Sequence, residues 1–280
     1  MYKPRVKAPS PELLEKTQRI LQKNALNTIC EAAACPNRAE CYKRRSATFM
    51  ILGATCTRAC SFCNVTTSKP LPPDSTEPAR LAKAIQELGL EYVVITSVDR
   101  DDLKDYGASH FLRCVTAIKE KNPNIKIELL TPDFKNDKEA LITILQTNAH
   151  KLAHNQETVK RISKKVRPQS SYERSLRVLE FYAKNSSSIV KSSLMVGLGE
   201  TRQELIETMH HLKNVGVEEI TIGQYLQPSP SHHPVIKYYE PLFFEEIKQE
   251  AYAIGFRAVA SGILVRSSYF ADQLGENNAR

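Results

Sequence analysis

Apolar, β-branched runs recur along the chain, and segments with helix-like periodicity separate them. Seven of these runs are expected to form strands, at residues 47–52, 92–98, 125–131, 150–153, 189–196, 219–225 and 257–260. Strands that alternate with helices in this way specify β/α units with a parallel sheet. The pattern yields roughly six β/α repeats, fewer than the eight of a closed barrel. We therefore predict an α/β fold, a partial, open (β/α)6-type TIM barrel.

The helix-like segments carry apolar residues at three- and four-residue spacing, as in Leu81, Ile85 and Leu88. Gly89 follows directly, and a glycine just past the last helical residue commonly ends a helix. The pattern Gly197-Leu198-Gly199-Glu200 predicts a tight turn from a strand into a helix, and it lacks the third glycine of a dinucleotide-binding fingerprint.

Short extensions flank the predicted barrel. Ser10 as N-cap and Pro11 at the first helical position predict a helix that runs to about residue 24. Beyond Gly262 the chain is polar and is expected to be irregular. We predict three parts: residues 1–46 as an N-terminal extension that carries three cysteines, residues 47–262 as the barrel, and residues 263–280 as a C-terminal segment.

Composition narrows the class of protein. No window approaches the roughly 18 consecutive apolar residues of a membrane span, and no signal peptide is readable, so we expect a cytoplasmic protein with no membrane partner. The net charge of +8 favours an acidic partner, and nucleic acid, an acidic carrier protein and a small anionic cofactor all remain open. The basic residues are scattered, which favours solvated faces and a local docking patch over a nucleic-acid-binding arm.

Cysteine usage points to metal. The chain has seven cysteines, an odd number, and six of them lie between Cys30 and Cys63. A disulfide framework is typical of much shorter secreted chains, so a reducing compartment and metal ligation fit better.

The strongest local signal is the C-x3-C-x2-C triplet of Cys56, Cys60 and Cys63, directly after the first predicted barrel strand. Three thiolates from one loop can hold three irons of a [4Fe–4S] cubane and leave the fourth iron open for chemistry. Loops at the C-terminal ends of barrel strands are also where such folds build active sites. Zinc is the competing metal, but a structural zinc site takes four ligands, usually as two separated pairs. We therefore favour the cluster.

A second triplet, Cys30, Cys35 and Cys41, has C-x4-C-x5-C spacing and lies upstream of the barrel. Two independent three-cysteine sets imply two clusters.

The first triplet, with Phe62 before its last cysteine, resembles the loop of the radical S-adenosylmethionine (SAM) superfamily. That resemblance implies that the open iron chelates SAM and that reductive cleavage gives a radical able to abstract hydrogen. The two triplets together are similar to those of lipoyl synthases. In that family the upstream set binds an auxiliary [4Fe–4S] cluster that is consumed as the sulfur source.

The resemblance extends to a C-terminal motif, Arg266-Ser267-Ser268-Tyr269, in which a serine holds the fourth auxiliary iron. It implies Ser268 as that ligand, with Ser267 as the alternative. Further segments that look like the family's cover nearly the whole chain, at residues 96–102, 128–134, 154–158, 164–168, 194–201 and 224–229.

SAM contacts are expected at two places. Thr96, Ser97, Asp99 and Asp101 follow the second predicted strand, where related enzymes bind the methionine end or the ribose; an aspartate-rich loop that caps the next helix is the alternative. Asn155 and Arg167 are candidates for the adenine edge or the carboxylate of SAM. Arg167 could equally make a structural ion pair.

The function implied by the resemblance is that of a lipoyl synthase, a sulfurtransferase that inserts two sulfur atoms at carbons 6 and 8 of an octanoyl group on a carrier-protein lysine. Implied partners are octanoylated carrier domains, namely the E2 subunits of 2-oxoacid dehydrogenases and the H protein of glycine cleavage, and an electron donor such as flavodoxin or ferredoxin. Rival enzymes are a biotin synthase-like protein and a tRNA methylthiotransferase. A non-catalytic iron–sulfur or zinc protein that binds nucleic acid is the rival from another class, and we predict no nucleic-acid partner.

Overall fold

The computed structural model describes residues 11–275 except 33–34, 36 and 44–45. The chain divides into two compact units. The N-terminal unit contains the described residues up to Arg58 and then Asn64–Lys151. The C-terminal unit contains the described residues from Leu152 on, together with Ala59–Cys63 from the middle of the first cysteine triplet.

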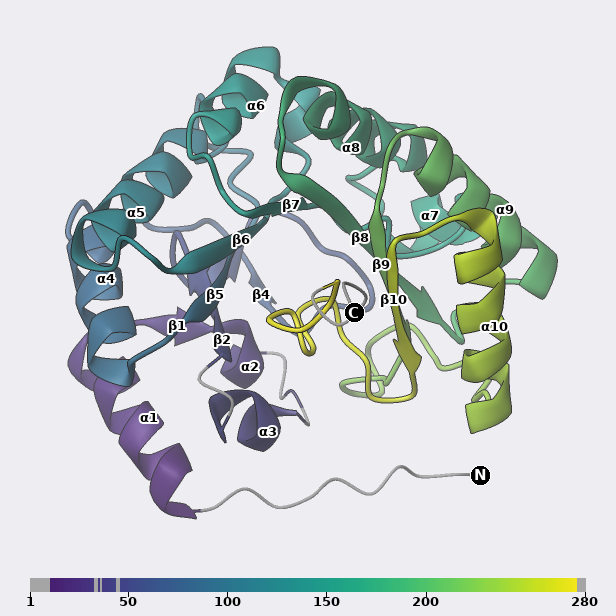
Figure 1. Cartoon of the computed structure of the whole chain (residues 1–280), viewed down its shortest axis with the longest axis horizontal. Helices are drawn as coiled ribbons and strands as arrows, with labels where there is room; N and C mark the ends of the chain where they lie inside the picture. The colour runs from purple at the N-terminus through teal and green to yellow at the C-terminus, as the bar shows by residue number, and fades with distance from the viewer. Residues whose placement is uncertain (1–10, 33–34, 36, 44–45, 276–280) are drawn as a thin grey trace. The chain divides into compact units, whose positions relative to one another are not determined.

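The N-terminal unit combines a parallel sheet with flanking helices (Figure 1). Its sheet runs in the order β1-β2-β5-β6, with β1 antiparallel to β2 and the other pairs parallel. In chain order its elements are α1 (Pro11–Lys23), β1 (Asn27–Thr28), α2 (Ile29–Ala32), α3 (Arg38–Lys43), β2 (Ser46–Ile51), β3 (Thr55–Cys56), β4 (Thr66–Thr67), α4 (Glu77–Leu88), β5 (Tyr92–Ser97), α5 (Ala108–Lys121), β6 (Lys126–Leu130), the 3-10 helix η1 (Phe134–Asn136) and α6 (Lys138–Leu145).

The C-terminal unit repeats the same β/α alternation. Strands β8, β9 and β10 are parallel neighbours, and His154, just after β7, donates its backbone N–H to Lys191 O in β8 at 3.2 Å. Its elements are β7 (Lys151–Ala153, whose first residue lies at the division), α7 (Lys160–Val166), α8 (Tyr172–Asn185), β8 (Ile189–Val196), α9 (Arg202–Asn214), β9 (Glu219–Gln224), α10 (Pro241–Ile254) and β10 (Ala258–Gly262).

Burial explains why the sheet strands read as continuous apolar runs. Every residue of β2 and of β9 is buried, because helices cover a parallel sheet on its outer face and other segments cover the inner one. Helix α4 turns its regularly spaced apolar side chains inward, and Leu81 and Ile85 are both 0% exposed. It ends at Gly89, whose φ of 60° is the left-handed conformation of a helix stop.

The α/β architecture predicted from the sequence is confirmed at the level of its elements. All seven expected strands are present as β2 and β5–β10, and the boundaries differ by a residue or two, as helix and strand ends usually do. The helix expected before the barrel is α1, while its proposed N-cap, Ser10, lies outside the described residues. The two-residue strands β1, β3 and β4 were not predicted, because so short a segment has no periodicity to detect.

The predicted tight turn at residues 197–200 is also confirmed. Gly197 has a φ of 98°, and a Cβ there would lie 2.2 Å from Gln224 Nε2, so only glycine fits without displacing its neighbour. The Glu200 carboxylate accepts hydrogen bonds from the backbone N–H groups of Gly197 and Leu198, at 2.6 and 2.9 Å.

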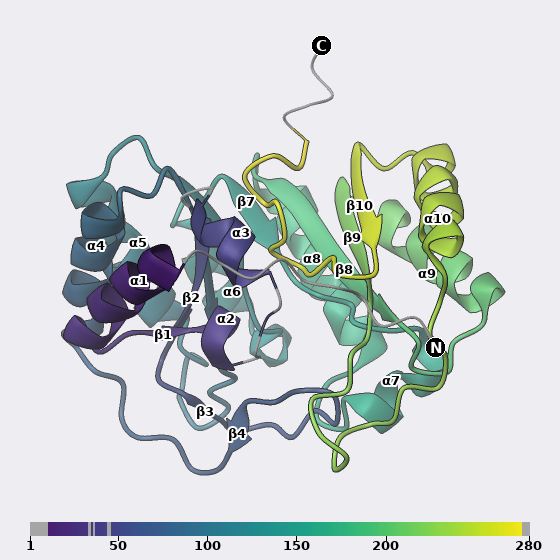
Figure 2. The same cartoon turned by 90° about the horizontal axis from the view of Figure 1, so that it is seen from below.

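The segment after β10 consists of turns as far as residue 275, and Figure 2 shows it in yellow leaving the end of β10. It packs closely on β9 of the same unit: a Cβ at Gly223 would lie 2.0 Å from Val265 O. The irregular structure expected for this segment is confirmed over residues 263–275. The three-part division at residues 46 and 262 stays a prediction, and residues 1–10, 33–34, 36, 44–45 and 276–280 of its parts lie outside the described residues.

Candidate functional site

The loop that follows β2 carries Cys56, which is buried and lies in the short strand β3. Its thiol donates to Asp99 Oδ2 at 3.8 Å and accepts from the Arg58 backbone N–H at 3.4 Å. Between them, Thr57 donates both its backbone N–H and its hydroxyl to Asp99 O, at 3.1 and 2.9 Å. The loop after β2 is therefore bonded to the loop after β5, which is where the sequence predicted Asp99 and Asp101 to act.

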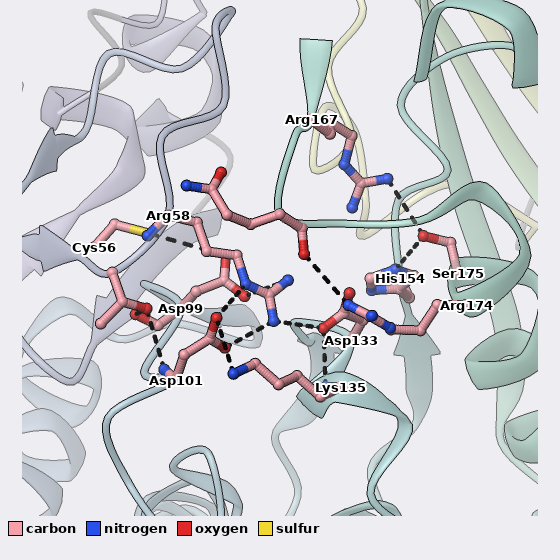
Figure 3. Close-up of polar contacts among 12 residues, drawn as sticks. Cys56, Arg58, Asp99, Asp101, Asp133, Lys135, His154, Arg167, Arg174 and Ser175 are labelled. Atoms are coloured by element: carbon pink, nitrogen blue, oxygen red, sulfur yellow. Dashed lines mark hydrogen bonds and ion pairs between the residues drawn. The ribbon is translucent and has the colours of Figure 1, made fainter. Parts of the chain in front are cut away.

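Arg58, Asp99, Asp101 and Asp133 form what we call the arginine cluster (Figure 3). The guanidinium contacts Asp99 Oδ1 at 3.2 Å, Asp101 Oδ1 at 2.8 Å and Asp133 Oδ1 at 2.7 Å. A second hydrogen bond, from Arg58 Nε to Asp101 Oδ2 at 2.9 Å, makes the Asp101 contact bidentate. Lys135 Nζ lies 3.6 Å from Asp101 Oδ2, at the more exposed edge of the cluster.

Burial makes this cluster strongly coupled. The side chains of Arg58 and Asp133 are 2% and 0% exposed, whereas those of Asp99 and Asp101 remain 24% and 19% exposed. Burial alone lowers the pKa of Arg58, but the hydrogen bond to Asp101 and the charges of Asp99 and Asp133 outweigh it and raise the pKa above its ordinary value. The guanidinium is thus always charged, and it holds two carboxylates that solvent or a ligand can still reach.

The two hydroxyl residues at the end of β5 differ in their bonding. Thr96 Oγ1 donates to Leu130 O of the neighbouring strand at 2.9 Å. Ser97 Oγ is buried and has no hydrogen-bond partner among the described residues. A buried hydroxyl without a partner costs free energy unless a ligand or water satisfies it. Ser97, which was predicted to bind SAM, therefore fits contact with a polar ligand at the end of β5.

Residues 59–63 are held within the C-terminal unit by backbone contacts. Ser61 donates its N–H to Val166 O at 2.9 Å and accepts the His233 N–H at 2.8 Å. Phe62 packs against the buried apolar cluster that contains Ile162 and Leu198. These contacts give the second half of the cysteine loop a defined conformation.

The last cysteine of the triplet is also anchored through its main chain. Cys63 N–H donates to Cys60 O at 3.0 Å, and His232 Nε2 lies 3.1 Å from Cys63 O. The two histidines of residues 232–233 thus contact the cysteine loop through its carbonyl groups.

Asn155 and Arg167, predicted as a second group of SAM contacts, lie together in the C-terminal unit. Arg167 Nη1 donates to Gln156 O at 3.1 Å and to Asn155 O at 3.4 Å. It also donates to Ser175 Oγ at 3.3 Å, as Figure 3 shows. Asn155 Nδ2 donates to Glu157 Oε1 at 3.1 Å. Burial raises the pKa of Glu157, and the charge of Arg167 and the Asn155 hydrogen bond only partly oppose that shift.

The upstream cysteines lie beside the same strand that leads to Cys56. Cys30 is in α2 and Cys41 in α3, and both helices contact β2. The Cys35 backbone N–H donates to Cys30 O at 3.0 Å. All seven cysteines are free of disulfides. The described residues contain no group of three His, Cys, Asp or Glu side chains close enough to hold one metal ion, but the ligands of a cubane each bind a different iron.

The sequence itself decides the family. Residues 50–212 match the radical SAM superfamily. Over 254 residues the chain is 52% identical to the lipoyl synthases of Yersinia pestis strain Pestoides F and Yersinia pseudotuberculosis serotype O:1b, and the match covers 90% of this chain and 79% of each relative. The chain belongs to the lipoyl synthase family.

Solved structures agree on the fold of this lipoyl synthase. Methylornithine synthase superimposes with a TM-score of 0.59 at 15% identity, over 90% of this chain and 72% of that one. HydG, a maturase of the [FeFe]-hydrogenase, gives 0.58 at 16% identity, over 87% and 63%. The predicted partial barrel, the radical SAM enzyme class and the lipoyl synthase function are confirmed. SAM and one [4Fe–4S] cluster follow from the superfamily.

Several residues of the lipoyl synthase site were not assigned a role from the sequence. Arg58 stands inside the first triplet, and Asp133 follows β6 in the same way that Asp99 follows β5, so a polar residue after a buried strand was the available signal. Glu157 and His232 gave no such signal, because only the folded chain brings them to Asn155 and to the cysteine loop. No described helix is long and apolar enough to cross a bilayer.

Proposed function

We propose that this lipoyl synthase holds two [4Fe–4S] clusters and inserts sulfur at carbons 6 and 8 of an octanoyl group on a carrier-protein lysine. Cys56, Cys60 and Cys63 hold the cluster that binds SAM. Cys30, Cys35 and Cys41, with Ser268, hold the auxiliary cluster. When bound, the first cluster and SAM would supply an electron and a hydrogen-removing radical, and the auxiliary cluster would supply the sulfur.

The observation that carries this proposal is the presence of two separate cysteine sets, before and after β2 in the chain. The helices that bear Cys30 and Cys41 both contact β2, and Cys56 follows the same strand. None of the six cysteines is in a disulfide, and three per set is the number that leaves one iron for another ligand. A single structural site would need only one of the sets.

The arginine cluster has a defined part in this proposal. Arg58 holds the carboxylates of Asp99 and Asp101 in fixed positions, so that they can accept hydrogen bonds from the ammonium or the ribose of SAM. Thr96 and Ser97 add hydroxyl groups at the end of the same strand. In the C-terminal unit, Asn155 and Arg167 are the proposed contacts for the adenine edge or the carboxylate.

Mass spectrometry of an octanoylated carrier peptide, with quantification of 5′-deoxyadenosine, tests the proposal under anaerobic conditions. Cys56→Ala is expected to abolish both deoxyadenosine and thiolated peptide. Cys35→Ala is expected to keep deoxyadenosine and lose thiolation, because only the sulfur source is damaged. Cys114→Ala is the matched control: that thiol lies in α5, burial raises its pKa, and both products should remain.

Each outcome has a distinct meaning. Deoxyadenosine without thiolated peptide in the unmodified protein would keep the radical enzyme but point to another substrate. Loss of deoxyadenosine in Cys35→Ala at normal iron content would contradict the division of roles between the two cysteine sets.

The serine ligand is tested by a neighbouring pair. Ser268→Ala should change the spectrum of the auxiliary cluster and lower thiolation, whereas Ser267→Ala should leave both unchanged. Oxygen is a weaker partner than thiolate for iron–sulfide, so a serine could leave as the cluster is dismantled. A Ser268→Cys variant with full turnover and normal cluster breakdown would count against this role.

The proposed partners are octanoylated carrier domains, those of E2 subunits and of the H protein, and an electron donor such as flavodoxin or ferredoxin. The net charge of +8 supports an acidic partner. The free cysteines support a reducing compartment, and we propose the cytoplasm. Carrier binding that does not weaken between low and high salt would contradict the electrostatic part of this proposal.

A further inference from the structure

Leu52 is a strained residue at the start of the cysteine loop. It directly follows β2, is 3% exposed and has a φ of 67°, a left-handed conformation that a branched apolar side chain rarely adopts. Gly53 follows with a φ of 92°. Two consecutive residues of this kind turn the chain sharply, four residues before Cys56. Such strain persists only where the surroundings hold it.

Two side chains from other elements hold the Leu52 peptide groups. Glu77, the first residue of α4, accepts the Leu52 N–H on Oε2 at 2.9 Å. Arg100 Nη1 donates to Leu52 O at 3.4 Å. The Leu52 side chain packs on the bare backbone of Gly107, where a Cβ would lie 2.4 Å from Leu52 Cδ1.

Both supports are themselves fixed. Arg100 is 1% exposed and makes two hydrogen bonds of 2.8 Å to the Asp102 carboxylate. Glu77 is 5% exposed, and His110 Nε2 lies 2.6 Å from the same Oε2 that accepts the Leu52 N–H.

The hydrogen bonds show which ring nitrogen of His110 carries the proton that faces Glu77. Arg113 Nη2 lies 3.2 Å from His110 Nδ1, and a guanidinium can only donate, so Nδ1 accepts. His110 Nε2 therefore carries the proton and donates to Glu77, whose Oε2 accepts from both Leu52 and His110. The position of Glu77 at the start of α4 also stabilises the buried carboxylate.

A glycine at position 52 would adopt this turn without strain, whereas leucine keeps it only because Glu77, Arg100 and Gly107 hold the residue in place. We propose that Glu77 and Arg100 are positioning residues, which lock the Leu52–Gly53 turn and thereby set the place and direction of Cys56. The inference rests on the proposed function, because it assumes that Cys56 is a ligand of the SAM-binding cluster. It adds residues of α4 and of the loop after β5 that act through Leu52.

The test uses protein in which Cys30, Cys35 and Cys41 are replaced by alanine, so that only the SAM-binding cluster contributes to the spectrum. Iron content and the electron paramagnetic resonance of the reduced cluster are measured while SAM is titrated. In this background Glu77→Ala is expected to lower the apparent SAM affinity about tenfold, because a small displacement of a ligand loop disturbs the fit of the bound group. Glu77→Gln keeps an oxygen acceptor for the Leu52 N–H and should titrate like its parent.

Rescue separates positioning from general stability. In Leu52→Gly protein the turn needs no support, so adding Glu77→Ala should leave the titration unchanged from that of Leu52→Gly alone. If Glu77→Ala does not fold with leucine present, Glu77→Asp, which withdraws the carboxylate by one methylene, takes its place. The positioning role would be overturned by an unchanged SAM titration in Glu77→Ala. It would also be overturned if Glu77→Ala lowered the apparent SAM affinity equally with leucine and with glycine at position 52.

The two proposals fail in different ways. A parent protein with no SAM-dependent change in its spectrum overturns the proposed function, and the positioning role falls with it. A SAM-dependent parent whose signal is indifferent to Glu77→Ala overturns the positioning role alone.

Discussion

Two buried arginines, one in each unit, are balanced in different ways. Arg58 of the N-terminal unit is 3% exposed and lies against three carboxylates. Arg167 of the C-terminal unit is 6% exposed, and its hydrogen bonds go to the carbonyl oxygens of Asn155 and Gln156 and to Ser175 Oγ. Arg58 is stabilised by direct ion pairs, whereas Arg167 donates its hydrogen bonds to neutral groups and interacts with Glu157 only through its charge.

The two units also differ in the contacts that fix their loops. In the N-terminal unit buried ionic groups lie beside the cysteine loop and Leu52. In the C-terminal unit Arg161 and Glu204 form a bidentate ion pair at the surface, and the C-terminal segment packs closely on Gly223. Removing one member of a buried ionic group leaves charge uncompensated, whereas removing a surface or packing contact does not.

Arg58→Met is therefore expected to give the largest effect. It removes the guanidinium that contacts Asp99, Asp101 and the 0%-exposed Asp133, and the loss of one partner of a buried ion pair costs about 3–5 kcal/mol. Urea unfolding of the anaerobic protein, followed by circular dichroism, measures it. Arg58→Lys retains the positive charge and should lower the free energy of unfolding by less. A cost below about 1 kcal/mol for Arg58→Met would mean that the cluster is not coupled as its distances indicate.

Arg167→Met should cost less, about 2 kcal/mol, because the acceptors that it leaves are neutral. The same urea titration compares the two arginines directly. Arg167→Lys serves as the control that keeps the positive charge but lacks the planar guanidinium group and its several N–H donors. An Arg167→Met loss equal to that of Arg58→Met would remove the distinction between the units.

Gly223→Ala tests the packing side of the comparison. Its Cβ would lie 2.0 Å from Val265 O, a backbone atom, so the turn that leads to Ser268 must move, at a cost of about 1–2 kcal/mol. Gly262→Ala is the matched control, since its Cβ would meet only the movable Val265 Cγ2, at 3.2 Å. Thermal unfolding of both variants measures the difference, and equal melting temperatures would contradict it.

The smallest effect is expected at the surface pair. Hydrogen bonds from Arg161 and from Thr201, the N-cap of α9, lower the pKa of Glu204 from 4.5 to about 2. Because the folded-state pKa is depressed, the stabilisation is complete above pH 4.5 and is lost as the pH falls toward 2. Glu204→Gln should cost below about 1 kcal/mol at pH 7 in low salt.

The control for this pair is ionic strength. High salt should shrink the Glu204→Gln difference, because exposed charges are screened, and leave the Arg58→Met difference nearly unchanged. Chemical unfolding at pH 5 and pH 3.5 supplies the second check. If the loss of unfolding free energy in Glu204→Gln were larger at pH 3.5 than at pH 5, the predicted direction of the pH dependence would be wrong.

The amino-acid sequence by itself determined the β/α alternation, the strands and the two cysteine triplets. Strand periodicity and C-x3-C-x2-C spacing are local, so they are readable without the fold. Asp99 and Asp101 were predicted from their place after the second strand, where related enzymes bind SAM, and their role stays a prediction.

Only the tertiary structure brought Arg58 to Asp133, 75 residues further along the chain, and Glu77 to the strained Leu52. The left-handed φ of Leu52 was not readable, because nothing in a leucine predicts it. Likewise, the sequence around Gly223 predicts only a strand residue, and the close contact with Val265 O appears only in the folded chain. The pairings arise from the register of parallel strands and from the need to compensate buried charge, and both depend on where distant segments meet.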